Sequence, residues 1–170
     1  PDKCLQLLAR LALEAHKQNT EKIHPLDMLS VVKDMKLEAE LFSGLDADQT
    51  EQINGIKAVL EADPAIDGVL GVGPVITMSA LAAAQDLGIE LTIGGFDMTP
   101  ELLDAIEAGD VAFTVDQQQY LQGYLPVVLM YLEATNANQA GGGLPVLTGP
   151  GFVTPDNAAA VKELSAAGTR

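Results

Sequence analysis

The stretch Leu91-Thr-Ile-Gly-Gly-Phe-Asp97, followed by Thr114-Val-Asp-Gln-Gln-Gln119, decides the expected fold of this chain. Each half is a short apolar run that ends abruptly in polar side chains. The segment between them begins with Thr99 and Pro100 and ends at Gly109, which are typical residues for the N-cap, the first turn and the end of a helix. A strand–helix–strand unit of this length predicts two parallel strands joined by a right-handed crossover.

Polar and aromatic residues lie where the two expected strands end. Asp97 and Gln117 come at their carboxyl ends, which is where open α/β sheets bind ligands. A carboxylate and an amide beside Phe96 suit a small polyhydroxylated molecule, because they bond to neighbouring hydroxyls while the ring packs against carbon atoms. The alternative is that these three residues have structural roles and bind no ligand. In that case Asp97 is a cap or turn residue, Gln117 a helix-start residue, and Phe96 a core residue.

The rest of the second half alternates between strand and helix patterns. Strands are expected at residues 39–43, 66–72, 90–96, 111–116 and 144–147. Helices are expected at residues 49–62, 75–87, 99–108, 120–134 and 156–167, the last with Asp156 as its cap, and residues 149–155 are expected to form an irregular connection. This alternation predicts an α/β fold, a three-layer sandwich with a mostly parallel sheet.

The composition changes near residue 40. Residues 1–40 contain six of the nine basic residues and carry a net charge of −1, whereas residues 41–170 carry −14. All sixteen glycines lie from Gly44 onward. We therefore expect a helical segment at residues 1–38, acting either as a hairpin for a partner or as cover for the sheet, and an α/β domain at residues 39–170.

The charge and the cysteine content exclude several classes of protein. A net charge of −15 argues against nucleic-acid binding, which needs a basic face. The single cysteine, Cys4, excludes an intrachain disulfide and is expected to be a small buried hydrophobe. The sequence contains neither a membrane-spanning apolar run nor a secretory signal, and the second absence leaves the compartment open.

The residues do not favour an enzyme, a metal site or a cofactor. The glycines of Gly71-Val-Gly-Pro74 lack the third glycine of a dinucleotide fingerprint, and Pro74 removes a backbone donor. His16 and His24, the usual kind of general base, precede every strand end of the predicted domain core. Asp97 and Asp116 are expected on different sides of their strand ends and therefore do not form a catalytic pair.

Several motifs between residues 40 and 161 resemble the second half of a type I periplasmic binding protein of the ribose and simple-sugar family. The motifs are Gln52-Ile-Asn-Gly-Ile-Lys-Ala58, Ile66-Asp-Gly-Val-Leu70, Gly94-Gly-Phe-Asp-Met-Thr-Pro-Glu101, Thr114-Val-Asp-Gln-Gln118, Tyr120-Leu-Gln-Gly123 and Thr148-Gly-Pro-Gly-Phe-Val-Thr154.

The resemblance implies one lobe of a sugar-binding protein that serves an ABC uptake system. It implies that Asp97 and Gln117 contact a sugar or polyol, that a membrane permease is a partner, and that the protein is periplasmic or extracellular. A family asparagine is replaced near Gly73 and Pro74, so the particular sugar stays open. Residues 1–38 show no such likeness.

The resemblance also implies a missing partner, because family members close two lobes around the ligand. The helix at residues 120–134 belongs to the other lobe in the family. Its apolar residues are therefore expected to be covered by the N-terminal helices, by a second chain or by self-association. They are Leu121, Leu125, Val128, Leu129 and Leu132.

Three functions remain open at this point. The first is non-catalytic sugar binding. We expect it to be weak or absent for this chain alone, because a single lobe leaves one side of the ligand exposed to solvent. The second is an oligomeric interaction subunit without ligand binding. The third is the sensing domain of a transcription regulator, which would need a basic DNA-binding segment that residues 1–40 do not supply.

Overall fold

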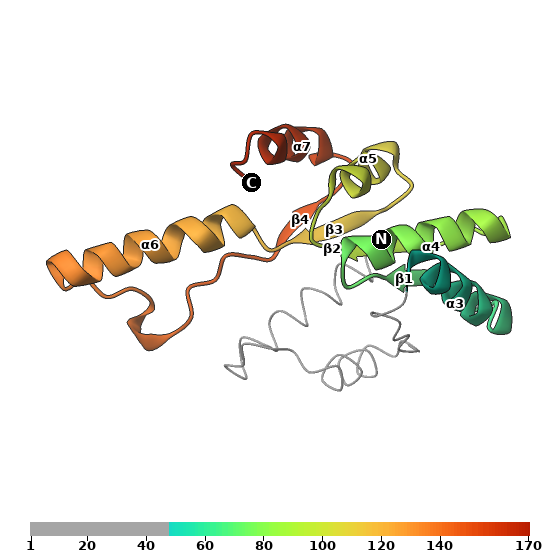
Figure 1. Ribbon diagram of the computed structural model, residues 1–170, viewed down its shortest axis with the longest axis horizontal. Helices are drawn as coiled ribbons and strands as arrows, with labels where there is room; N and C mark the ends of the chain where they lie inside the picture. Colours follow the sequence, from blue (N-terminus) through green and yellow to red (C-terminus); the bar gives the residue numbers. More distant parts are fainter. Residues whose placement is uncertain (1–47) are drawn as a thin grey trace. The chain divides into compact units, whose positions relative to one another are not determined.

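The computed structural model describes residues 48–170, which form one compact unit. The elements, in chain order, are α3 (Gln49–Ala62), β1 (Gly68–Leu70), α4 (Pro74–Leu87), β2 (Thr92–Phe96), α5 (Pro100–Ala108), β3 (Phe113–Asp116), α6 (Gln119–Asn136), the short 3₁₀ helix η1 (Gly141–Gly143), β4 (Gly151–Val153) and α7 (Ala158–Ala166) (Figure 1). The predicted helices of residues 1–38 and the predicted strand at 39–43 lie outside the described residues.

The four strands form one sheet in the order β1-β2-β3-β4. β1 pairs in parallel with β2, and β2 in parallel with β3, whereas β4 is antiparallel to β3. The α/β fold with a mostly parallel sheet is therefore confirmed. Because β1, β2 and β3 run in the same direction, their carboxyl ends meet at one edge of the sheet.

The helices begin and end at the residues that local chemistry favours. The Thr99 hydroxyl accepts a hydrogen bond from Leu102 N at the start of α5, and Pro100 occupies its first turn. Gly109 and Gly88 end α5 and α4 in the left-handed region, with φ of 87° and 65°. Asp48 caps α3 by accepting from Glu51 N at 2.9 Å. These boundaries confirm the predicted ones to within a residue.

The C-terminal part of the chain differs from the prediction. Residues 144–147 are not a strand, and the strand is instead β4, inside the expected irregular connection. Leu144 and Leu147 are 60% and 63% exposed, whereas Val153 pairs with β3 and is fully buried. A short apolar run becomes a strand only where it can pair with the edge of a sheet, and here the later segment, Gly151–Val153, pairs with β3.

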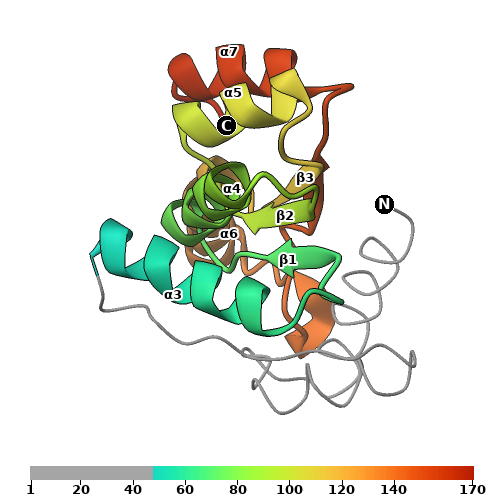
Figure 2. The same ribbon diagram turned by 90° about the vertical axis from the view of Figure 1, so that its right-hand side faces the viewer.

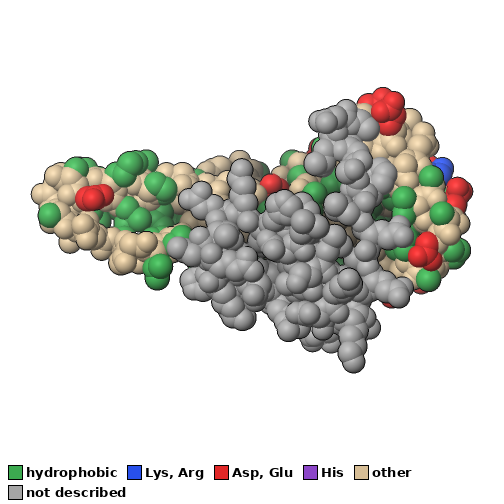
Figure 3. Space-filling view, turned by 90° about the horizontal axis from the view of Figure 1, so that it is seen from below, with side chains coloured by type: hydrophobic (Ala, Val, Ile, Leu, Met, Phe, Trp, Pro, Cys, Tyr) green, Lys and Arg blue, Asp and Glu red, His purple; other side chains and the backbone are tan. Residues whose placement is uncertain are grey.

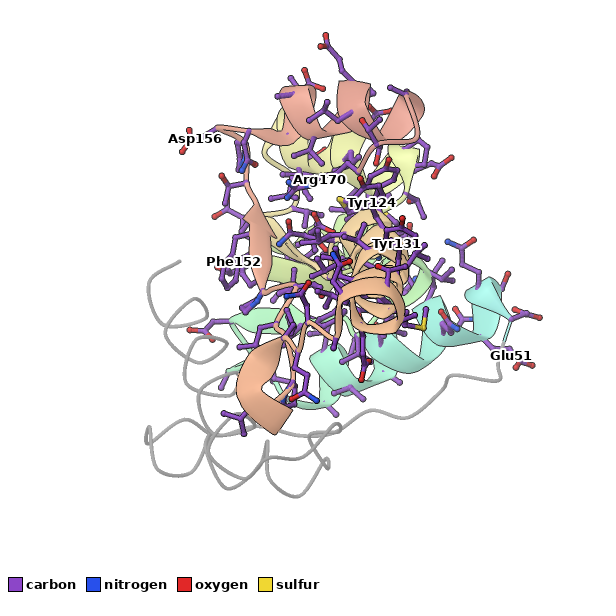
Figure 4. All side chains as sticks on the ribbon, turned by 90° about the vertical axis from the view of Figure 1, so that its left-hand side faces the viewer. Glu51, Tyr124, Tyr131, Phe152, Asp156 and Arg170 are labelled. Carbon is purple, nitrogen blue, oxygen red and sulfur yellow. The ribbon has the colours of Figure 1, made fainter. Side chains whose placement is uncertain are left out.

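The start of the last helix also differs from the prediction. α7 begins at Ala158, with Asn157 rather than Asp156 at the N-cap position. The Asn157 side chain bonds the preceding loop, accepting from Thr154 N at 2.8 Å and donating to Phe152 O at 3.0 Å. Asp156 is exposed (Figure 4). The asparagine thus fixes the loop that leads into the helix.

The helices α3, α4, α5 and α7 lie in a row along one face of the sheet (Figure 2). Ile93 and Val153 point toward these helices and belong to the larger of the two apolar clusters formed by residues 48–170. That cluster comprises Ala84, Ile93, Leu102, Leu103, Ala105, Ile106, Val111, Val153, Ala158 and Val161. The second cluster joins α3 to α4 through Ile56, Leu60, Ala80 and Ala83. These clusters hold the described unit together.

Helix α6 is the exception among the long helices, since none of its residues is buried. The residues expected to lack a neighbour, such as Leu121 and Leu125, are half-buried. The most exposed apolar side chains lie instead on a different stripe, whose members recur every three or four residues. This stripe consists of Tyr120, Tyr124, Val127 and Tyr131, which are 48–66% exposed, and Met130, which is 61% exposed, lies next to it in sequence. Figure 3 shows hydrophobic side chains gathered over α6 and the segment that follows it.

The close pairing of β2 with β3 predicts that Gly94→Ala destabilises the fold. A Cβ atom at Gly94 would lie 2.5 Å from the ring of Phe113, which is only 2% exposed. We expect the substitution to lower the free energy of unfolding by about 1–3 kcal/mol, because the ring has little room to move. Equilibrium urea denaturation measures this loss.

Gly123→Ala is the matched control, since a Cβ there meets no atom within 4 Å. Alanine in helix α6 is expected to leave stability unchanged or to raise it by up to about 1 kcal/mol. Equal midpoints for wild type and Gly94→Ala would contradict the close contact.

Candidate functional site

The carboxyl edge of the parallel strands carries the candidate site. The chain leaves β1 at Gly71, leaves β2 at Asp97 and leaves β3 at Gln117. At the β1 end, a side chain at Gly73 would meet no atom within 4 Å. Gly73 therefore leaves open space at the β1 end, and the polar groups described below come from the segments that follow β2 and β3.

Asp97 is held firmly in an unusual backbone conformation. Its φ is 62°, in the left-handed region that aspartate tolerates better than most residues. Its backbone N donates to Val115 O at 2.8 Å, and its carbonyl accepts from the Thr114 hydroxyl at 2.7 Å. Both bonds tie Asp97 to β3, so the strand pairing determines where its carboxylate lies.

The structure brings Asp97 and Gln117 together. Gln117 Nε2 donates to Asp97 Oδ1 at 2.7 Å, and both residues are half-buried. Gln119, at the start of α6, donates to the same oxygen through its Nε2 at 2.9 Å. The sequence showed Gln119 only as the last of three glutamines, because its approach to Asp97 depends on how the chain turns after β3.

Phe96, the third residue predicted for the site, ends β2 opposite Val115. It is half-buried. Side chains alternate along a strand, so Phe96 lies on the same face as Gly94 and opposite to Gly95, whose Cβ position faces Thr77 of α4. The ring therefore lies on the face of the sheet away from α4, and its contact with a ligand stays a prediction.

Asp116 is fully buried beside the site and is paired. Its Oδ2 accepts from Arg170 Nε at 2.8 Å, and its Oδ1 accepts from Gln118 N at 2.7 Å. Figure 4 shows Arg170 between α7 and the strands. Asp116 therefore does not join Asp97 in a carboxylate pair, as the strand alternation predicted. Sequence reasoning missed Arg170, because it lies 54 residues from its partner.

The segment after α6 returns to support the same edge. Gln118, with φ of 59°, donates through Nε2 to Thr148 O at 2.6 Å. The Thr148 hydroxyl donates to Gln117 O at 3.3 Å. Both bonds tie the backbone that follows β3 to Thr148.

The site offers hydrogen bonds, and residues 48–170 include no histidine or cysteine. Within residues 48–170, no group of three or more histidine, cysteine, aspartate or glutamate side chains is arranged to hold a metal ion. Among the described helices, none combines the length and the apolar character needed to cross a bilayer. A carboxylate and two amides at this edge can donate to and accept from the hydroxyls of a neutral ligand.

Comparison with known proteins identifies the family. Residues 14–138 match the family described as "Periplasmic binding protein domain". The chain belongs to this family. The matched range includes most of residues 1–38, which differ in composition from the rest of the chain. The boundary between a helical segment at residues 1–38 and an α/β domain at residues 39–170 stays a prediction.

Individual relatives of this family member are sugar-binding proteins. The xylose/arabinose-binding protein XylF of Sulfolobus acidocaldarius is 28% identical over 116 residues, which make up 64% of this chain and 28% of that protein. A carbohydrate transporter from Acidothermus cellulolyticus 11B, solved in complex with myo-inositol, is 35% identical with a TM-score of 0.73. That match covers 85% of this chain and 52% of the other.

A Caulobacter myo-inositol binding protein, solved with myo-inositol, shares the fold at 18% identity. Its TM-score is 0.63, and the match covers 83% of this chain and 50% of the other. The chain thus spans about half the length of these solved structures and about a quarter of XylF. The resemblance to part of a type I periplasmic sugar-binding protein is confirmed.

The Asp116–Arg170 pair predicts that Arg170→Ala destabilises the fold. The substitution leaves a fully buried carboxylate without its cation. We expect a loss of about 2–3 kcal/mol in the free energy of unfolding, because a buried charge without a partner is costly although Arg170 is itself 28% exposed. Equilibrium denaturation checks it.

Lys57→Ala serves as the control for a surface ion pair. Lys57 Nζ lies 3.1 Å from Asp86 Oδ2, and the Asp86 side chain is 58% exposed. Its removal is expected to cost less than about 1 kcal/mol. Similar losses for the two variants would show that the Asp116 carboxylate is not buried as the structure has it.

Proposed function

We propose that the chain binds a small sugar or polyol without catalysis. The observation that carries this proposal is the convergence of Asp97 and Gln117, 2.7 Å apart between Oδ1 and Nε2, at the carboxyl edge of the sheet. In the proposed complex the carboxylate accepts from sugar hydroxyls, and the Gln117 amide both accepts and donates. Phe96 packs against the ring carbons of the sugar.

The ligand class follows from what the site offers and from the relatives. The groups at the edge suit neutral hydroxyls, and no lysine or arginine adjoins Asp97 and Gln117 in sequence. The relatives are named for xylose and arabinose or were solved with myo-inositol. A pentose, a hexose or a cyclic polyol fits this pattern, and the site would reject analogues that leave its buried polar groups unpaired.

The cellular role we propose is substrate capture for an ABC uptake system. In this role the chain is part of the substrate-binding component, works in the periplasm or outside the cell, and delivers the sugar to a membrane permease. Family membership supports this role. The alternative, an interaction subunit without ligand binding, draws no support from the comparisons.

The proposed site predicts that Asp97→Ala abolishes sugar binding. myo-Inositol, D-xylose and L-arabinose are titrated into the ¹⁵N-labelled chain and followed by NMR, which detects millimolar affinities. Asp97→Asn keeps a residue suited to the left-handed backbone and is expected to bind about tenfold more weakly than wild type, because a charge-assisted hydrogen bond becomes a neutral one.

Asp110→Ala is the matched control for this titration. Asp110 is exposed and follows α5, at the opposite end of β3 from the site. The Asp110→Ala variant is expected to bind the sugars with wild-type affinity. No response of the wild-type chain to any of the three sugars would refute sugar binding by this chain.

We further propose that self-association covers the exposed face of α6. The stripe of Tyr120, Tyr124, Val127 and Tyr131 supports this, since contiguous exposed apolar side chains mark interaction surfaces. The rings of Tyr120 and Tyr124 stack with centroids 6.0 Å apart, which makes that end of the stripe flat. Figure 4 labels Tyr124 and Tyr131 on the helix.

A double substitution in this stripe tests the proposal. Val127 and Tyr131 are 62% and 66% exposed, so Val127→Lys with Tyr131→Lys is expected to leave the fold intact and to convert an oligomer into a monomer. Light scattering after size-exclusion chromatography measures the mass. Glu133→Lys changes the net charge by the same amount outside the stripe and is expected to stay oligomeric. A monomeric wild type would overturn self-association.

A further inference from the structure

The first residue of α6 points back to the site. Gln119 Nε2 donates to Asp97 Oδ1 at 2.9 Å, although Gln119 is exposed and belongs to a different element from Gln117. A long polar side chain on a surface loses rotamer freedom when it is held in one place. A hydrogen bond to a carboxylate is among the few contacts strong enough to offset that loss.

The turn after β3 directs Gln119 to this place. Asp116 Oδ1 accepts from Gln118 N at 2.7 Å, and Gln118 has a left-handed φ of 59°. This turn leads into α6, whose first residue reaches Asp97 just after the end of β2. The buried Asp116, paired with Arg170, therefore places Gln119 as well as Gln117.

The two glutamines together saturate one oxygen of Asp97. A carboxylate oxygen has two lone-pair positions, and Gln117 and Gln119 each fill one on Oδ1. The carboxylate cannot rotate without breaking both bonds. Its second oxygen, Oδ2, is then left in a fixed direction to accept from a ligand.

The remaining hydrogen-bonding capacity is mostly that of acceptors. Oδ2 of Asp97 and the Oε1 atoms of both glutamines accept, while each amide keeps one further N–H to donate. The Nε2 atoms of Gln117 and Gln119 bond the same oxygen, at 2.7 Å and 2.9 Å, so the two amides lie close to each other. The two amides and the free oxygen of Asp97 are thus grouped around one carboxylate, and such a group suits hydroxyls on neighbouring carbons of one ring.

We propose that Gln119 is a specificity-determining residue, which selects ligands with three contiguous free hydroxyls over deoxy analogues. The inference rests on the proposed sugar-binding function and deepens it. Gln119 binds one of the three hydroxyls and also orients Asp97 for the second, with Gln117 on the third. A ligand lacking one of the three hydroxyls leaves either an amide or the carboxylate of the site without its partner, which costs affinity.

The test compares Gln119→Leu with wild type against two ligands. Leucine keeps the bulk of the side chain and favours the helix, so α6 still begins at the same place. The ligands are myo-inositol and a monodeoxyinositol, titrated into the full chain and followed by NMR. Gln119→Leu is expected to bind myo-inositol about tenfold more weakly and to lose most of the preference for it over the deoxy compound.

Gln122→Leu is the control, since Gln122 is exposed on the same helix, nearly one turn further along. It is expected to match wild type with both ligands. Wild-type affinity and preference in Gln119→Leu would overturn this inference and leave the proposed function intact. No binding of either ligand by wild type would overturn both.

Discussion

Strands β2 and β3 run parallel and pair through Gly94 and Phe113, then Gly95 and Thr114, then Phe96 and Val115. This register places the end of β2 beside the end of β3 and lets Asp97 bond to β3 through both its N–H and its carbonyl. Gly94 makes the register possible, because a side chain there would collide with the ring of Phe113. A shift by one residue would move every side chain of the edge to the other face of the sheet. The site therefore depends on this pairing.

The second support of the site is electrostatic. Asp116 lies fully buried one residue before Gln117, and a charge in that position needs a partner. Arg170 supplies it from beyond α7, and the other carboxylate oxygen holds the backbone of Gln118. The end of the described chain is thus tied to the turn that carries the glutamines. This tie stiffens the edge of the sheet that carries Gln117.

Helix α6 contributes to the site at its first residue and exposes apolar side chains along the rest of its length. Its first residue takes part in the hydrogen bonds of the site, while its exposed stripe of three tyrosines and a valine leaves apolar surface in water. The chain spans about half the length of the solved relatives. The exposed stripe agrees with the self-association proposed above, and the hydrogen bonds of Gln119 agree with the proposed binding of a sugar or polyol.

The sequence by itself determined those features that depend on neighbouring residues. Thr99, Pro100 and Gly109 set the bounds of α5, and Gly88 ended α4, because caps and left-handed ends act within a single turn. The regular alternation of strand and helix determined the parallel sheet, and with it the meeting of Asp97 and Gln117. These predictions required no knowledge of distant contacts.

Only the tertiary structure decided the rest. β4 formed at Gly151–Val153 and not at residues 144–147, because the edge of β3 accepts one segment and leaves the other exposed. Arg170 found Asp116 across 54 residues, and Gln119 reached Asp97 across 22, through a turn whose direction depends on that buried carboxylate. Such contacts are decided by burial and charge pairing between elements, and no local pattern in the chain records them.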